Sequence, residues 1–221
     1  MIMVIEVVLI AMLIAVGYVA SCFYLSNTKW KSADFKVCSL NKERIVYLII
    51  TIVIGIYLMY VLHFFRETDI VTQITTICLI YTLLPAAAVD FKVKKIPNQF
   101  LIVSLLVRVM LYALEFMQDI PSAVFALKED ILGATIMGAF FFLTFLIFKN
   151  GIGMGDVKLF ALMGLYQGLE GVVNSIFFSL IASFFVAVTL LATKKKHRSD
   201  TIPFGPCILL GALMALRLTS V

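Results

Sequence analysis

The sequence has few of the residue types that metal, disulfide and nucleophilic sites depend on. Charged residues make up 14% of its 221 residues, and it contains two histidines, one tryptophan and four cysteines. The cysteines contain no C-x-x-C pair, so they predict neither a zinc site nor a disulfide framework (Cys22, Cys38, Cys78 and Cys207). His63 and His197 stand alone at the edges of apolar segments. We therefore expect no metal and no cofactor.

Apolar residues dominate instead. They make up 62% of the chain, and the mean hydropathy is +1.08, which excludes an ordinary soluble domain. Runs of about 20 apolar residues, enough to cross about 30 Å of hydrocarbon, recur along the chain. The predicted fold is all-α, a polytopic membrane helical bundle of about eight spans in one integral-membrane domain. The spans are expected near 3–25, 45–65, 70–89, 99–118, 131–148, 157–169, 171–193 and 202–218.

The distribution of basic residues predicts the orientation of these spans. With the N-terminus outside, the cytoplasmic loops are 26–44, 90–98, 149–158 and 194–201, and they hold 14 of the 18 Lys and Arg residues. The positive-inside rule favours this arrangement. Most acids, including Glu129 and Asp130, then lie outside or near the outer boundary. The net charge of +5 follows from topology, so no nucleic-acid partner is implied.

Two apolar segments differ from an ordinary membrane span. The first apolar run resembles a secretion signal, but it is long, carries Glu6 and has no basic residue before Lys29, so we expect no cleavage. The segment 157–169 covers about 20 Å as a helix, which is short for a span. A re-entrant hairpin there would place the basic run from Lys194 to Arg198 outside. We therefore expect a short or partly unwound span buried in protein.

Two acids share the predicted cytoplasmic boundary. Asp90 ends the third span, and Asp156 opens the sixth directly after the glycines at 153 and 155. Carboxylates at a hydrocarbon boundary are costly and indicate a functional site. If the two carboxyl groups share a site of low dielectric, repulsion keeps one protonated while the other is ionised. The ionised group can then take a proton from an attacking water while the protonated one polarises a carbonyl.

A less specific interpretation is that each Asp flanks a helix end beside Lys92 or Lys158 in the headgroup region. Arg108 lies inside the fourth predicted span, where it could pair with an acid or face the bundle interior, and we assign it no chemical role.

The run Pro203-Phe204-Gly205-Pro206 interrupts regular helix at the start of the last span. Its free backbone groups could hold an extended substrate, or it could simply begin a helix after a loop.

Together these residues resemble the type IV prepilin peptidase family, membrane aspartyl proteases of the GxGD type. The resemblance covers roughly residues 70–218 and lies in three motifs in the family's order: Asp90 followed by Ile96-Pro97-Asn98, then Gly153-Met154-Gly155-Asp156-Val157-Lys158-Leu159, then Pro203-Phe204-Gly205-Pro206. It implies a helical bundle in the cytoplasmic membrane of a prokaryote. It also implies that Asp90 and Asp156 are the catalytic acids, while Gly153, Gly155, Lys158, Pro97, Asn98 and residues 203–206 shape the site or bind substrate.

The implied activity is removal of the short basic leader from prepilins, pseudopilins or related proteins at the cytoplasmic face of the bilayer. Larger family members carry paired C-x-x-C motifs in a cytoplasmic segment associated with N-methylation, whereas the loop 26–44 here has Cys38 alone. We therefore expect a peptidase without methyltransferase activity. Residues 1–69 are predicted to form a two-helix segment and 70–221 the peptidase core. The alternatives are a proton-coupled transporter using the two acids and a non-catalytic pilus or secretion assembly subunit.

Overall fold

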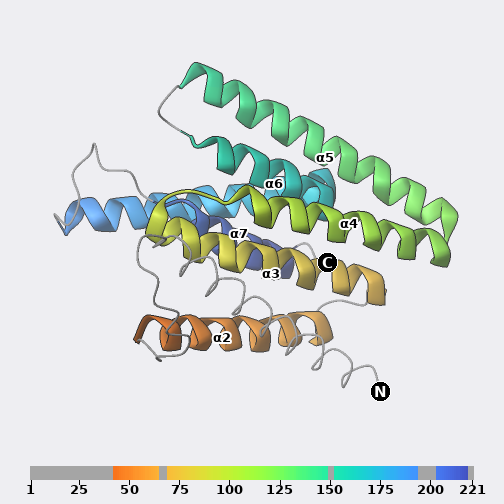
Figure 1. The fold of residues 1–221 in the computed structure, drawn as a ribbon, viewed down its shortest axis with the longest axis horizontal. Coiled ribbons are helices and arrows are strands. Elements are labelled where there is room, and N and C mark those ends of the chain that lie inside the picture. Colours follow the sequence, from red (N-terminus) through yellow and green to blue (C-terminus); the bar gives the residue numbers. More distant parts are fainter. Residues whose placement is uncertain (1–41, 65–68, 149–151, 194–202, 219–221) are drawn as a thin grey trace, which may run out of the picture. The chain divides into compact units, whose positions relative to one another are not determined.

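The computed structural model describes residues 42–64, 69–148, 152–193 and 203–218. Within these ranges all regular structure is α-helical, as predicted (Figure 1). The predicted span 3–25, most of the loop 26–44 and the basic run 194–198 lie outside the described residues. The helices are α2 (Lys42–Phe64), α3 (Ile70–Val93), α4 (Asn98–Gln118), α5 (Ile120–Ile147), α6 (Met154–Ala192) and α7 (Gly205–Leu218).

The chain divides into two compact units, residues 1–67 and 68–221. In the first unit the described helix is α2, whose sequence is apolar over Ile49–Val61. The second unit contains α3 to α7, with both predicted acids and all three sequence motifs. The assignment of residues 1–69 to a two-helix segment and of residues 70–221 to a peptidase core remains a prediction.

Four of the described helices are long and apolar enough to cross a membrane: α3, α4, α5 and α6. Two shorter apolar helical stretches, Ile49–Val61 and Gly205–Leu216, accompany them. These findings agree with a membrane protein, while the predicted total of about eight spans is not confirmed. Along its apolar window α3 is 72% buried, against 22% for α4 and 17% for α5. The helix α3 is therefore enclosed, as is most of α7, whereas the outer sides of α4 and α5 are exposed and apolar.

One predicted boundary was wrong. The fifth predicted span begins at 131, whereas α5 begins at Ile120. The Asp119 side chain caps this helix by accepting a hydrogen bond from the Ser122 N–H at 3.3 Å, and a proline stands in its first turn. Asp130 lies inside the helix and is buried, because its charge is paired with Arg108 rather than exposed at a boundary.

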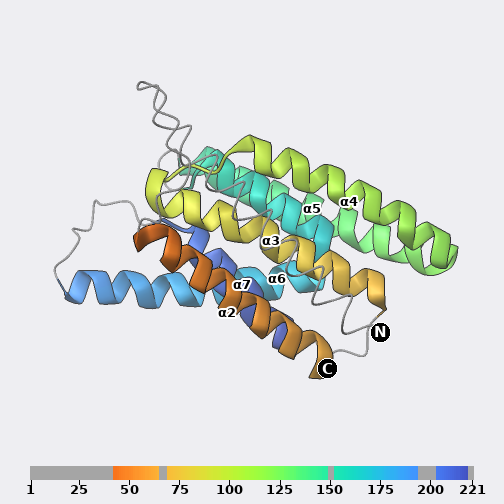
Figure 2. The same ribbon diagram turned by 60° about the horizontal axis from the view of Figure 1, so that its bottom comes forward.

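The sixth helix contains a reversal of the chain. Gly168 has φ 66° and ψ −175°, a backbone conformation that is essentially restricted to glycine. It separates a short arm, residues 154–167, from a long arm, residues 169–192. Figures 1 and 2 show the long arm running back in the direction opposite to the short arm. The break lies two residues before the predicted boundary between the segments 157–169 and 171–193. The short arm packs within the second unit against α4 and α5.

Candidate active site

Asp90 lies in the last turn of α3 and is 7% exposed. Its backbone carbonyl accepts a hydrogen bond from the Lys94 N–H at 2.8 Å, and Lys94 adopts the left-handed conformation that ends the helix. Its side-chain Oδ2 accepts a hydrogen bond from the backbone N–H of Gly205 at 2.8 Å. The first acid is therefore held between the end of α3 and the beginning of α7.

Asp156 lies in the first turn of α6 and is half-buried. Gly153 caps this helix, and its N–H donates to Asp156 Oδ2 at 3.3 Å. The free N–H groups at the beginning of a helix favour a carboxylate there. The Asp156 N–H in turn donates to the Gly153 backbone carbonyl at 3.0 Å, so Gly153 holds both the backbone and the side chain of the second acid.

The two acids come from segments that pack together. Gly155, beside Asp156, approaches Ile96 of the connection that follows Asp90, and Phe160 of α6 contacts Phe204, beside the glycine that binds Asp90. The carboxyl groups of Asp90 and Asp156 are near enough for the charge of Asp90 to act on Asp156, although 66 residues separate them in sequence. Two neighbouring carboxyl groups that are partly removed from water can divide the roles of proton donor and proton acceptor.

The connection between α3 and α4 packs on the first turn of α6. A Cβ placed on Gly155 would lie 3.0 Å from the Cβ of Ile96, so the glycine is required by the close approach of the two segments. Pro97 is buried and begins α4. Lys158 Nζ donates to Asn98 Oδ1 at 3.1 Å, so this lysine reaches across to α4 at the exposed edge of the site.

The run of residues 203–206 lies against the first acid. Gly205 is buried, and a Cβ there would lie 2.9 Å from the Asp90 Cβ and 3.1 Å from the Ala87 Cα. Phe204 makes an edge contact with Phe160 of α6, with ring centroids 5.9 Å apart. The two flanking prolines, 203 and 206, are half-buried. This segment therefore begins α7 and closes one side of the acid pair.

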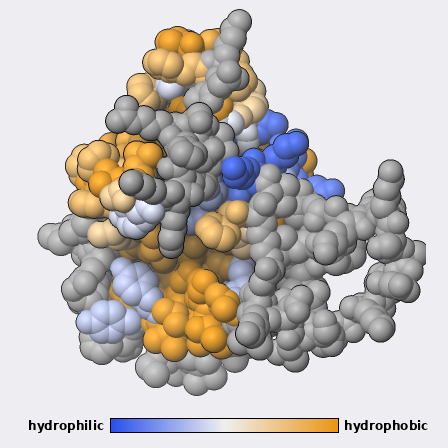
Figure 3. Space-filling model, turned by 90° about the vertical axis from the view of Figure 1, so that its left-hand side faces the viewer, coloured by the Kyte–Doolittle hydropathy of each residue, from blue (hydrophilic) through white to orange (hydrophobic). Residues whose placement is uncertain are grey.

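The end of the second unit that carries the acids is polar. In Figure 1, α3 ends and α4, α6 and α7 begin there, and Figure 3 shows a hydrophilic cluster on this side. The exposed polar residues at this end include Lys94, Lys95, Asn98, Gln99 and Lys158. In the parts of the chain that the structure describes, no group of three or more His, Cys, Asp or Glu residues is arranged to hold a metal ion.

Sequence reasoning missed three residues that shape the site. Ile96, Ala87 and Phe160 contact or closely approach the glycines and the aromatic ring described above. The run of three alanines before Asp90 was a usable signal, because small side chains allow another backbone to approach. Ile96 was quoted as part of a motif without a role of its own. Nothing local to Phe160 indicates its contact with Phe204.

The fold and the site define an all-helical membrane protein with two acids on neighbouring segments at one end of α3 and α6. Residues 77–191 match the type IV leader peptidase family, a segment that includes both acids. The chain therefore belongs to this family.

Individual relatives agree with this assignment. The chain is 28% identical over 135 residues to a "Prepilin leader peptidase/N-methyltransferase" of Bacillus subtilis strain 168, covering 60% of this chain and 51% of the relative. It is 23% identical over 179 residues to a protein of the same description from Pseudomonas putida, covering 81% and 62%. A "Type 4 prepilin-like proteins leader peptide-processing enzyme" of Escherichia coli O78:H11 is 39% identical over 70 residues, covering 32% and 24%. The chain spans about half the length of the first of these relatives, and no solved structure matches it.

Proposed function

We propose that this protein is a membrane aspartyl endopeptidase that removes the short basic leader from prepilins, pseudopilins or related proteins. The observation that carries the proposal is the placement of Asp90 and Asp156 on neighbouring segments, where they are held by the beginnings of α7 and α6. Family membership and the descriptions of the relatives support the same chemistry.

The proposed reaction uses water as the nucleophile. The ionised Asp takes a proton from water as its oxygen attacks the carbonyl carbon of the scissile peptide, while the protonated Asp donates a hydrogen bond to the carbonyl oxygen. Collapse of the tetrahedral intermediate breaks the C–N bond, and the leaving amine receives a proton from an Asp. The pair is treated as a unit, since coupled carboxyl groups titrate together. The proposed step uses no metal and no cofactor.

The proposed location is the cytoplasmic membrane, with the site at its cytoplasmic face. Support comes from the density of basic residues near the acids, among them Lys94 and Lys95, because such residues favour the cytoplasmic side. A prepilin has a basic leader followed by an apolar helix that sits in the bilayer, so its scissile bond lies at the same boundary. Labelling a single cysteine at position 195 from either side of the membrane tests the orientation, and access from outside contradicts it.

The function is tested by co-expressing the chain with prepilins that carry an N-terminal epitope tag and measuring leader removal by mass. We expect Asp90→Asn and Asp156→Asn each to abolish processing while the protein still accumulates in the membrane. Asp69→Asn is the matched control, because Asp69 is exposed at the other end of α3 and makes no side-chain cap there. Full processing by either site variant would leave a transporter or an assembly subunit as the better interpretation. Intact mass also tests the proposal that this chain does not methylate the new amino terminus.

A further inference from the structure

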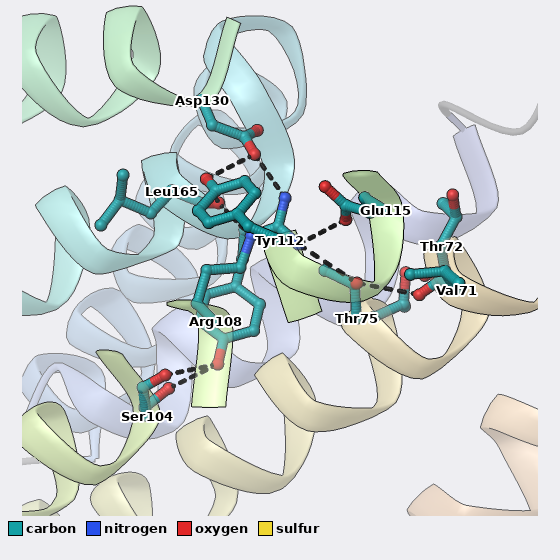
Figure 4. A network of polar contacts seen from close by, with 11 residues as sticks. Val71, Thr72, Thr75, Ser104, Arg108, Tyr112, Glu115, Asp130 and Leu165 are labelled. Carbon is teal, nitrogen blue, oxygen red and sulfur yellow. Dashed lines mark hydrogen bonds and ion pairs between the residues drawn. The ribbon is translucent and has the colours of Figure 1, made fainter. Parts of the chain in front are cut away.

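A buried polar cluster lies away from the acid pair, at the far end of the short arm of α6. Arg108 of α4 is 3% exposed and forms ion pairs with Glu115 and with Asp130 of α5 (Figure 4). Tyr112 donates a hydrogen bond to Asp130 Oδ2 at 2.8 Å, and its ring lies 4.0 Å from the Arg108 guanidinium carbon. A charged cluster buried among apolar helices is costly, so a role beyond filling space is expected.

The cluster is connected to the backbone of the short arm at its C-terminal end. The short arm ends before Gly168, so its last four carbonyl groups have no N–H partner within the arm. Arg108 Nε donates to one of these carbonyl oxygens, that of Leu165, at 2.7 Å, and the Tyr112 hydroxyl, whose one proton is shared with the shorter bond to Asp130, lies 3.1 Å from the same oxygen. A positive charge at this end of a helix is also favoured by the helix dipole. The guanidinium therefore acts as a C-terminal cap supplied by another helix.

The fifth helix supports the same turn from another direction. A Cβ on Gly133 would lie 2.7 Å from the backbone of Gly168, and a Cβ on Gly164 would lie 2.4 Å from the backbone of Ala134. Asp130 Oδ1 would lie 3.6 Å from a Cβ on Gly168. The reversal is thus seated against α5 by backbone contact, while Arg108 holds it from α4.

The consequence concerns the acid at the other end of the arm. Asp156 lies nine residues before Leu165 on the same helix, a rise of about 14 Å. An α-helix is stiff over this length, so the position of its C-terminal end determines the position of its first turn. A displacement of about 1 Å at reacting groups can lower a rate by about 100-fold.

We propose that Arg108, oriented by Asp130, is a positioning residue: by capping the short arm at Leu165 it fixes where Asp156 stands relative to Asp90. This inference rests on the proposed peptidase function for its kinetic consequence, but its structural part concerns the placement of the short arm. The hydrogen bonds and ion pairs of Arg108 and Asp130 in the described part of the chain go to other residues than the two acids, so neither takes part in the chemical step.

The test separates this role from ordinary stabilisation. Arg108→Met alone leaves Asp130 buried without a partner, so that variant is expected to fold poorly. A triple variant, Arg108→Met with Asp130→Leu and Glu115→Gln, removes all three charges of the cluster, which usually restores stability. The triple variant still lacks the guanidinium that caps the Leu165 carbonyl and keeps just the neutral Tyr112 hydroxyl near it. We expect it to regain the thermal stability of the original protein while its kcat for leader removal stays at least about 10-fold lower, with KM changed less than about 2-fold. Arg108→Lys, which keeps the charge, is expected to lie between the two.

A second measurement does not depend on activity. In a background with all four cysteines replaced by alanine, Asn98→Cys and Lys158→Cys place thiols on α4 and near the first turn of α6, where the original side chains are in contact. We expect a short bis-maleimide to cross-link this pair several-fold more slowly when the Arg108→Met, Asp130→Leu and Glu115→Gln changes are present. Leu213→Ala, a cavity variant in α7, is the control that lowers stability without touching the cluster.

The outcomes are distinct. Lower kcat with slower cross-linking supports the proposal. Original kcat or original cross-linking in the stable triple variant overturns it, because then the cluster serves stability alone. If the unmodified chain cleaves no prepilin, the proposed function fails, and slower cross-linking would still support the positioning of the short arm by Arg108.

Discussion

The backbone N–H of Gly205 donates a 2.8 Å hydrogen bond to Asp90 Oδ2 across 115 residues of sequence. This contact joins the last motif of the chain to the first acid. It removes one lone-pair direction of the carboxyl group from further use and leaves Oδ1 free of this contact. A backbone donor cannot be lost by side-chain substitution, so the space around the glycine is the feature that mutation can test.

Gly205→Ala should therefore remove most of the proposed leader peptidase activity. The added methyl group would lie 2.9 Å from the Asp90 Cβ and 3.1 Å from the Ala87 Cα, and a backbone atom cannot yield as a flexible side chain does. We expect kcat/KM for leader removal to fall about 100-fold through displacement of Asp90. Gly138→Ala is the control, because its methyl group would meet just the Ala161 methyl group, at 3.2 Å. Equal activity of the two variants would show that α7 does not fix the first acid.

Gly155→Ala tests the contact between the first turn of α6 and the preceding connection. The new Cβ would lie 3.0 Å from the Ile96 Cβ and should push Asp156 away from its partner. We expect about a 10-fold lower kcat, measured on a tagged prepilin. Ile96→Gly removes the opposing Cβ, so the double variant should recover part of the loss. No recovery would mean that the glycine is needed for another reason.

Much of this site could be predicted from sequence because its residues are local signals. Apolar runs predicted α3, α4 and α7 to within a few residues, and the glycines before Asp156 indicated the second acid. The residues that contact each acid could not be predicted in this way. The contact of Gly205 with Asp90 depends on how α7 packs against α3, and no periodicity within either segment records it.

The error at the start of α5 has a comparable cause. Lys128, Glu129 and Asp130 read as a polar boundary because three adjacent charges are costly inside a membrane. The structure neutralises Asp130 with Arg108, whose own charge was recognised but could not be assigned a partner from sequence alone. The side chain that determines the boundary thus lies on another helix.

The Lys158–Asn98 contact should have a modest effect. It is a single hydrogen bond at 3.1 Å between exposed side chains, and such a bond contributes about 0.5–1.5 kcal/mol. We expect Asn98→Ala and Lys158→Met each to lower kcat/KM by about 2- to 10-fold. If the two residues act through this bond, kcat/KM of the double variant should be no lower than that of the less active single variant. Multiplied losses in the double-mutant cycle would mean that each residue also contacts substrate separately.

Gly168→Ala tests the reversal of α6 by stability rather than by activity. At φ 66° and ψ −175° a side chain is strained even where space is available, and the nearest atoms to a new Cβ are 3.6 Å away. The strain should lower the free energy of unfolding by about 1–3 kcal/mol. Thermal unfolding in detergent micelles measures this as a lower midpoint, and Gly138→Ala, a glycine inside α5 whose φ is negative, should show no comparable loss. An unchanged midpoint for Gly168→Ala would mean that the two arms can be joined by an ordinary backbone conformation, and that glycine there serves neither the turn nor the placement of the short arm.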